Sequence, residues 1–114
     1  MFFDQDALNV RILDVLELNQ ENSDTLNRRG YHALSFRVEA DTHLSFSDRT
    51  IYAGNGTIGY FPANLSYRRQ SLRDKMIVIH FDIMDYHSGN IEIISMEDSS
   101  QVHSLFQEAL TAWK

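Results

Sequence analysis

The chain has 114 residues, enough for one domain with a core of its own but not for two. It carries 16 acidic against 10 basic side chains, a net charge of −6, so this chain by itself is not expected to bind DNA phosphates. It has no cysteine, which excludes disulfides and thiolate metal sites and is compatible with the cytoplasm. No apolar run approaches the roughly 20 residues that cross a bilayer, and no signal segment opens the chain. We therefore expect one cytoplasmic domain with no membrane segment.

The first third of the chain begins with an apolar segment and continues with a polar one. Residues 8–18 are rich in Val, Ile and Leu with partial alternation, which predicts a strand, although the spacing would also suit a short helix. Residues 19–27 are polar and predict a loop. Arg28 and Arg29 follow as an isolated basic pair, which we interpret as a solvated edge rather than a phosphate site.

Clear two-residue alternation begins at Gly30. In residues 30–39 one face carries His32, Leu34, Phe36 and Val38, and the other carries Tyr31, Ala33, Ser35 and Arg37. Residues 44–47 and 49–53, separated by a Ser-Asp turn, predict a tight hairpin.

The middle of the chain is punctuated by glycine and proline. Three glycines within residues 54–59 break regular structure, and a short apolar run then stops at Pro62, the only proline. Residues 62–64 supply turn chemistry, residues 65–71 predict a strand, and residues 73–75 predict a charged turn. The strongest strand signal covers residues 76–83, with Ile77, Ile79 and Phe81 on one face and Val78 and His80 on the other. Residues 86–90 predict a loop and 91–95 a last short strand.

The period changes near the end of the chain. Apolar residues recur at helical spacing and form one stripe: Val102, Leu105, Phe106, Ala109, Leu110 and Trp113. Asp98 and Gln101 resemble a capping box. We expect Leu105 and Phe106 to pack on the β-structure and Trp113 to stay partly exposed. Seven or eight short strands followed by one helix predict a mainly β fold, a small barrel or jelly roll.

The glycine–proline segment also carries a family resemblance. Gly56, five residues, Pro62, one residue, Asn64, two residues and Tyr67 resemble the second cupin motif, G-x5-P-x-G-x2-H, with Asn and Tyr at its last two marked positions. The flanking segments, YHALSFRVE from Tyr31 and MIVIHFD from Met76, resemble the N-terminal sensing domain of AraC-family transcriptional regulators. The resemblance runs from about Gly30 to Trp113.

This resemblance implies a fold and a biological setting. It implies a cupin-type double-stranded β-helix for residues 1–98, with residues 99–114 forming a C-terminal helix of the same domain that is suited to dimerisation. It further implies a homodimer that regulates transcription and a helix-turn-helix DNA-binding domain that this chain does not contain.

Metal and catalytic chemistry find little support in the residues. The metal ligands of catalytic cupins fall near Asn27, Arg29, Ala33 and Tyr67, none of which is a usual ligand for such a metal. The five histidines lie in five different segments, no G-x-S-x-G elbow is present, and the G-x-G-x-x-G of residues 54–59 runs into a strand instead of opening a helix. We predict no metal, no cofactor and no enzymatic activity.

A ligand pocket is the remaining hypothesis. The cupin position that falls near Ala33 implies that its face of the strand looks into the barrel, and Tyr67 shares a side with Arg69. Arginines suit a carboxylate or phosphate and aromatic faces suit a sugar ring. The alternative is that Arg37 and Arg69 lie outside in salt bridges. The predicted ligand-binding residues are Tyr31, Ser35, Arg37, Tyr67, Arg69 and His80.

Two functional hypotheses follow. The first is an effector-sensing and dimerisation domain of an AraC-type regulator, which binds a small polar molecule such as a sugar or a small acid and reaches DNA only through the absent domain. The second is a stand-alone cupin-like enzyme such as a sugar isomerase.

Overall fold

Antiparallel strands make up most of the structure, a computed structural model that describes residues 1–84 and 86–114. Its elements in chain order are η1 (Phe2–Asp4), β1 (Val10–Asn27), β2 (His32–Phe46), β3 (Arg49–Gly54), β4 (Thr57–Phe61), β5 (Tyr67–Ile83), β6 (Glu92–Ser95) and α1 (Ser100–Trp113). The predicted fold class, mainly β with one C-terminal helix, is confirmed. No helix among the described residues is both long and apolar enough to cross a membrane.

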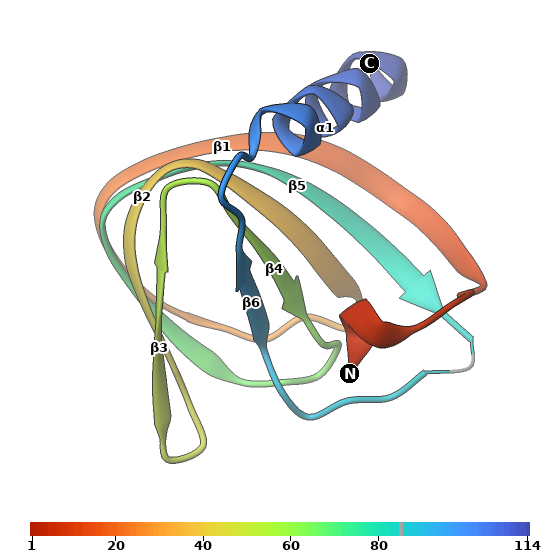
Figure 1. The fold of residues 1–114 in the computed structure, drawn as a ribbon. Coiled ribbons are helices and arrows are strands. Elements are labelled where there is room, and N and C mark those ends of the chain that lie inside the picture. Colours follow the sequence, from red (N-terminus) through yellow and green to blue (C-terminus); the bar gives the residue numbers. More distant parts are fainter. Residues whose placement is uncertain (85) are drawn as a thin grey trace.

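A single curled sheet forms the barrel. Its long central strand, β2, has different neighbours in its first and second halves. The order is β1-β5-β2-β4-β6, with β3 also paired to β2. One edge of β2 pairs with β5 from His32 to Ser45, whereas the other edge pairs first with β4 and then, from Asp41 onward, with β3. Figure 1 shows β1, β5 and β2 curving together around the interior, so each long strand serves both walls of the jelly roll.

Irregular pairing marks the places where these strands bend. The register between β2 and β5 shifts at Arg37/Glu39 and again at Asp41/Thr42, and Asn22 in β1 has a positive φ of 48°. An extra residue in one strand bends it and reverses which positions face inward. As a result, odd-numbered residues of β2 face the interior up to Arg37, and even-numbered residues do so from Ala40 onward.

Three sequence predictions about strand limits are wrong for the same reason. Residues 19–27, predicted as a loop, are the second half of β1 and pair with β5. Residues 73–75, predicted as a charged turn, continue β5 without a break, and β2 also runs unbroken from His32 to Phe46. Polar residues are compatible with a strand where one side faces water, and here pairing on the neighbouring strand decides the outcome. The hairpin between β2 and β3 and the turn at residues 62–64 are confirmed.

Two apolar clusters lie on opposite sides of the sheet. The outer cluster joins the convex face to the helix, and its buried members are Val15, Phe36, Ile77, Phe106 and Leu110. The inner cluster fills one end of the barrel with Ala33, Leu44, Phe46, Ala53, Phe61, Tyr67 and Ile91. Ile77 and Ile79 pack on the outer side, on the face that their alternation predicts.

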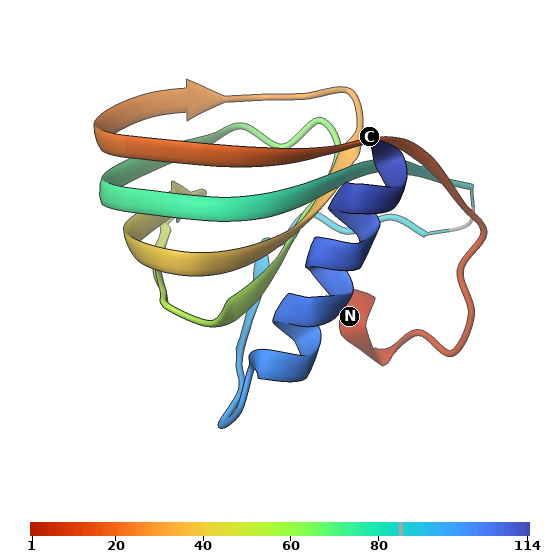
Figure 2. The same cartoon turned by 90° about the horizontal axis from the view of Figure 1, so that it is seen from above.

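The C-terminal helix covers the convex face. Figure 2 shows α1 lying across the outside of β1, β5 and β2, and these are the strands it contacts. Phe106 is buried as expected and Trp113 is 48% exposed, but Leu105 is 56% exposed, so its predicted packing is wrong. The predicted capping box is also absent: Ser99 is the N-cap, and Asp98 accepts a hydrogen bond from the amide of Ser100.

The N-terminal segment covers the same face beyond the end of the helix. The ring of Phe2 stacks on Tyr60 with centroids 4.1 Å apart, and its backbone N–H donates to Glu92. Tyr60 is fully buried beneath it and contacts His32 Nδ1 at 2.9 Å. The helix and the N-terminal segment each bury part of the outer face, whereas other side chains of the sheet, such as Tyr52 and Leu72, stay exposed.

Candidate functional site

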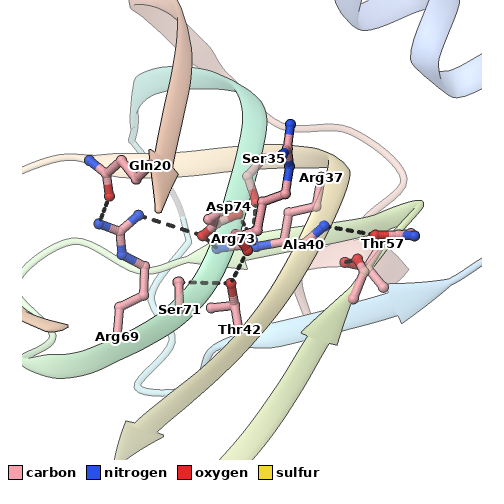
Figure 3. A network of polar contacts seen from close by, with 12 residues as sticks. Gln20, Ser35, Arg37, Ala40, Thr42, Thr57, Arg69, Ser71, Arg73 and Asp74 are labelled. Carbon is pink, nitrogen blue, oxygen red and sulfur yellow. Dashed lines mark hydrogen bonds and ion pairs between the residues drawn. The ribbon is translucent and has the colours of Figure 1, made fainter. Parts of the chain in front are cut away.

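A buried ion pair lies at the centre of the barrel interior. Arg37 projects inward from β2 just before the bend, and Asp74 projects inward from β5 beside it (Figure 3). Their closest ion-pair contact is 3.2 Å, from Nε to Oδ1, and Arg37 Nη1 donates to Ser35 Oγ at 2.9 Å. Arg37 is 1% exposed and Asp74 0%, so water contributes nothing to their solvation.

A second arginine shares the same carboxylate. Arg69, on the preceding part of β5, places Nη1 3.5 Å from Oδ2 of Asp74 and donates through Nη2 to Gln20 of β1. Arg69 is 7% exposed, and its Nε is buried with no hydrogen-bond partner in the described part of the chain. Two buried guanidinium groups therefore face one carboxylate, which leaves one positive charge uncompensated.

Burial also acts on the proton equilibrium of this cluster. Loss of solvation lowers the pKa of Arg37, and the charge of Asp74 opposes that shift. The nearby charge of Arg69 lowers the pKa of Arg37 further. A guanidinium remains protonated in proteins. Burying these two positive charges with one carboxylate therefore lowers the stability of the folded state. An anion placed between the two arginines would offset this loss.

A small cavity adjoins the two arginines. Its volume is about 20 Å³, and its lining comprises Leu18, Arg29, Ala33, Ser35, Arg37, Phe61, Tyr67, Arg69, Met76 and Val78. A space of this size holds about one water molecule. The interior is therefore nearly filled in this conformation, and a larger ligand must displace part of the lining.

Arg29 and Tyr67 form a polar contact in the same lining. Arg29 Nη1 donates to the Tyr67 hydroxyl at 2.9 Å, and the Tyr67 ring packs on Phe61 with centroids 5.3 Å apart. The sequence interpretation of Arg29 as part of a solvated edge is wrong, because its side chain turns into the barrel mouth. Arg29 is only partly buried, unlike Arg37 and Arg69.

A histidine–carboxylate pair lies at the edge of the interior: His80 is buried, whereas the side chain of Asp14 is 41% exposed. His80 Nδ1 lies 2.6 Å from Oδ1 of Asp14 on β1, and the Tyr31 ring meets the imidazole edge-on at 4.7 Å. His80 is 5% exposed. Burial lowers the pKa of His80, hydrogen bonding and charge from Asp14 oppose this, and the charge of Arg29 lowers the pKa further.

The structure places the six predicted ligand-binding residues in two neighbouring groups. The cavity lining contains Ser35, Arg37, Tyr67 and Arg69. His80 lies on the same interior face, two residues beyond Val78, and Tyr31 contacts His80 outside the lining itself. The alternative in which Arg37 and Arg69 point outward is wrong.

Sequence reasoning missed four residues that lie in this interior or at its edge: Asp14, Gln20, Arg29 and Asp74. Asp74 stands between Arg73 and Lys75, and three consecutive charges are typical of a turn. In a strand the same three residues alternate: Arg73 turns outward and pairs with Glu39 at 2.7 Å, while Asp74 turns inward. An unbroken alternation of inward and outward side chains through residues 67–83 would have predicted one continuous strand. The register shifts between β2 and β5 interrupt that alternation.

A metal centre of the kind known in catalytic cupins does not fit these residues. Of the four positions that correspond to the metal ligands, Arg29 and Tyr67 hydrogen-bond to each other, Ala33 has no donor atom, and Asn27 turns its amide to Thr25. A guanidinium and a methyl group cannot supply nitrogen or carboxylate ligands. Residues 1–84 and 86–114 contain no cluster of three His, Asp or Glu side chains that could hold a metal ion.

A much larger surface depression lies away from the predicted site. Its volume is about 710 Å³, and it follows β6 and the preceding loop, with Ile51 and Arg49 of β3 on its other side. It shares no residue with the cavity around Arg37, and none of the predicted ligand-binding residues lines it. Sequence reasoning gave no indication of this depression.

Comparison with known proteins places the fold. No family model matches the sequence, and no curated protein matches it significantly. Solved structures do match. The ethanolamine utilization protein Q of Salmonella typhimurium aligns with a TM-score of 0.56 and 11% identity over 68% of this chain and 71% of that one. A DUF861 family protein of Thermotoga maritima aligns with a TM-score of 0.50 and 12% identity over 68% of this chain and all of its own. The fold is that of a cupin.

A third solved structure has a similar fold. A protein of Neisseria meningitidis aligns with a TM-score of 0.53 and 17% identity over 65% of this chain and 84% of its own. The predicted cupin-type jelly roll is thus confirmed. At such identities the likeness establishes the fold of the barrel and leaves its ligand to be argued from its own residues.

Proposed function

We propose that this cupin barrel binds a small anionic ligand, such as a small carboxylic acid, beside Arg37 and Arg69. The observation that carries the proposal is the charge imbalance of the interior. Two arginines, each more than nine-tenths buried, share the single carboxylate of Asp74. Burying an unpaired charge is costly, whereas guanidinium groups bind carboxylates by charge-assisted hydrogen bonds.

The unused hydrogen-bonding capacity of the cluster supports the same ligand class. Arg69 Nε is buried without a hydrogen-bond partner among the described residues. Ser35 Oγ and the Tyr67 hydroxyl, which lie in the same lining, can donate to a carboxylate oxygen. Buried donors without partners are rare in native proteins, so their presence beside a cavity favours a ligand.

The small cavity explains how occupancy could become a signal. A space of about 20 Å³ admits little more than one water, so a carboxylic acid must move the lining outward. The contacts that close it, Arg29 with Tyr67 and Arg69 with Gln20, join three different segments of the barrel. A ligand that breaks them shifts the balance between two arrangements of the domain, which is what a sensor requires.

The regulatory setting rests on the sequence resemblance. In an AraC-type regulator the barrel would report ligand occupancy to attached helix-turn-helix units, with α1 lying between them and serving dimerisation. We therefore propose binding without turnover as the activity of this chain. A native reading frame that lacks such units would remove the regulatory setting and leave the anion site standing.

Ligand-dependent stabilisation tests the anion site. Melting temperatures of the wild-type chain would be recorded with acetate, propionate, lactate and succinate at constant ionic strength, and with uncharged sugars alongside. A ligand that prefers the folded state raises the melting temperature, by mass action. We expect one or more carboxylates to do so and Arg69→Met to abolish the shift.

The neighbouring arginine provides a matched control. Arg68 lies next along β5 but turns outward to Asp24, at 2.6 Å. Arg68→Met should retain the wild-type response to carboxylates. An equal loss in both variants, or equal stabilisation by uncharged sugars, would contradict the proposed site.

A further inference from the structure

The buried imidazole of His80 lies at the edge of the proposed anion site. It projects from β5 on the same face as Val78, and its cross-strand partner on β2 is Ala33. Val78 and Ala33 both line the cavity beside the arginines. His80 is not itself a lining residue in this conformation, but it lies next to two of them on the interior face, on the side toward which an enlarged cavity would extend.

Asp14 determines which nitrogen of His80 carries the proton. Its Oδ1 lies 2.6 Å from Nδ1, and a carboxylate can only accept in such a contact. Burial lowers the pKa of His80, which favours the neutral ring. The proton of that neutral ring lies on Nδ1, so Nε2 presents a lone pair.

That lone pair has no partner in the described part of the chain. Nε2 of His80 is buried and accepts no hydrogen bond from residues 1–84 or 86–114. The ring of Tyr31 covers the imidazole by its edge, with centroids 4.7 Å apart. A buried acceptor held in a fixed tautomer without a donor is a site prepared for a donor from outside.

The surrounding charge selects the kind of donor. Three arginines line the adjoining cavity (Arg29, Arg37 and Arg69), against two carboxylates: Asp74 within the arginine cluster and Asp14 beside His80. Arg29 is close enough to act on the ionisation of His80 itself. An ammonium group would be repelled by these cations, whereas a hydroxyl group donates its hydrogen bond without adding positive charge.

We propose that the ligand is a hydroxycarboxylate, whose carboxylate lies against the arginines and whose hydroxyl donates to Nε2 of His80. This inference rests on the proposed anion site and specifies its ligand. Asp14 acts as the positioning residue, since it fixes the tautomer without touching the ligand. The His80–Asp14 pair thus favours a ligand with an uncharged hydroxyl over one with a methylene or an amine at the same position.

Matched ligands of equal length test this specificity. Binding constants would be measured by calorimetry for lactate, propionate and alanine, and for 3-hydroxybutyrate with butyrate. We expect one or both hydroxy acids to bind about tenfold or more tightly than their deoxy partners, a ratio of dissociation constants that calorimetry resolves easily. Alanine should bind more weakly than lactate.

Variants of the pair separate its role from simple packing. His80→Phe fills the space without an acceptor and should erase the hydroxyl preference while carboxylates still bind, whereas His80→Gln, whose amide oxygen accepts, should keep part of it. Asp14→Asn, whose amide can donate to Nδ1, permits the other tautomer and should reduce the preference. The exposed His43→Phe serves as the control and should change nothing.

The outcomes distinguish the two proposals. If carboxylates bind in an Arg69-dependent manner with equal affinity for each hydroxy and deoxy pair, the hydroxycarboxylate inference is overturned and the anion site remains. A preference that survives in His80→Phe also overturns it, since the hydroxyl then binds elsewhere. If no carboxylate binds in an Arg69-dependent manner, both proposals fail.

Discussion

The two faces of the curled sheet differ in what they bury: beneath the helix the outer face buries apolar side chains, whereas the inner face buries a charged cluster beside its own apolar cluster. On the outer face Phe36 and Ile77 pack against Phe106 of the helix. On the inner face of the same two strands, Arg37 of β2 faces Asp74 of β5. Adjacent residues of one strand therefore differ in role: Phe36 packs in the apolar cluster beneath the helix, whereas Arg37 contributes a buried charge to the interior.

The two faces are distinguished by the chemistry of their buried groups and not by how deeply those groups are buried. Burial alone does not distinguish the faces, because Phe36 and Arg37 are both 1% exposed. The chemistry of what is buried does, since an apolar group gains from burial and an incompletely paired charge does not.

The largest expected effect comes from breaking the outer face. Phe36→Ala removes a ring that contacts both His103 and Phe106 of α1, with centroids 5.1 and 5.8 Å away. The free energy of unfolding should fall by about 3–5 kcal/mol, as for other buried phenylalanines. Urea unfolding would measure it. A loss no larger than that of an exposed apolar residue such as Leu72 would show that the helix does not hold the sheet.

Breaking the inner face should cost somewhat less and should respond to anions. Asp74→Asn leaves Arg37 and Arg69 without a counter-charge, so the free energy of unfolding should fall by about 3 kcal/mol. A small carboxylate at high concentration should restore part of that loss. The exposed Asp24→Asn is the control. If both variants unfold alike, the inner charges do not lower the stability of the folded state as described above.

Acidification should affect both faces through one histidine on each. Burial lowers the pKa of His32, on the outer side, and of His80, on the inner side, from the ordinary 6.5. As the pH falls through this ordinary pKa, the two histidines bind more protons in the unfolded chain than in the folded chain. The free energy of unfolding therefore decreases as the pH falls.

Variants resolve this pH dependence. Melting temperatures between pH 7.5 and 5.5 should decline less steeply in His32→Gln and in His80→Gln than in the wild-type chain. The exposed His43→Gln should retain the wild-type slope. An unchanged slope in both buried-histidine variants would contradict the assignment of the neutral form to the folded state.

The smallest effect is expected where the helix stripe meets water. Leu105 is 56% exposed although its spacing predicts packing, whereas Leu110 is 7% exposed. Leu105→Gln should change the free energy of unfolding by less than about 0.5 kcal/mol, while Leu110→Ala should lower it by about 2–5 kcal/mol. A large loss in Leu105→Gln would mean that this side of α1 is covered in solution, for example by a second copy.

The sequence by itself determined the local features of this protein. Two-residue alternation put Ser35 and Arg37 on one face and Phe36 on the other, and the helical stripe identified α1. The turn at Pro62 and the hairpin at Ser47 also follow from residue chemistry that acts over a few positions. Such signals are reliable because the side-chain direction in a strand or helix is fixed by nearby backbone geometry.

Only the tertiary structure decided which groups meet inside the barrel. The sequence predicts Asp74 to lie in a turn and Arg29 to be a surface cation. Nothing in the sequence around Asp14 indicates that it contacts His80. Their positions depend on bulges that reverse the facing of β2 and β5, and on pairing between segments 66 residues apart. Alternation reports which neighbours share a face, but it carries no information about which distant strand lies opposite, because that is set by the bending and closure of the whole sheet.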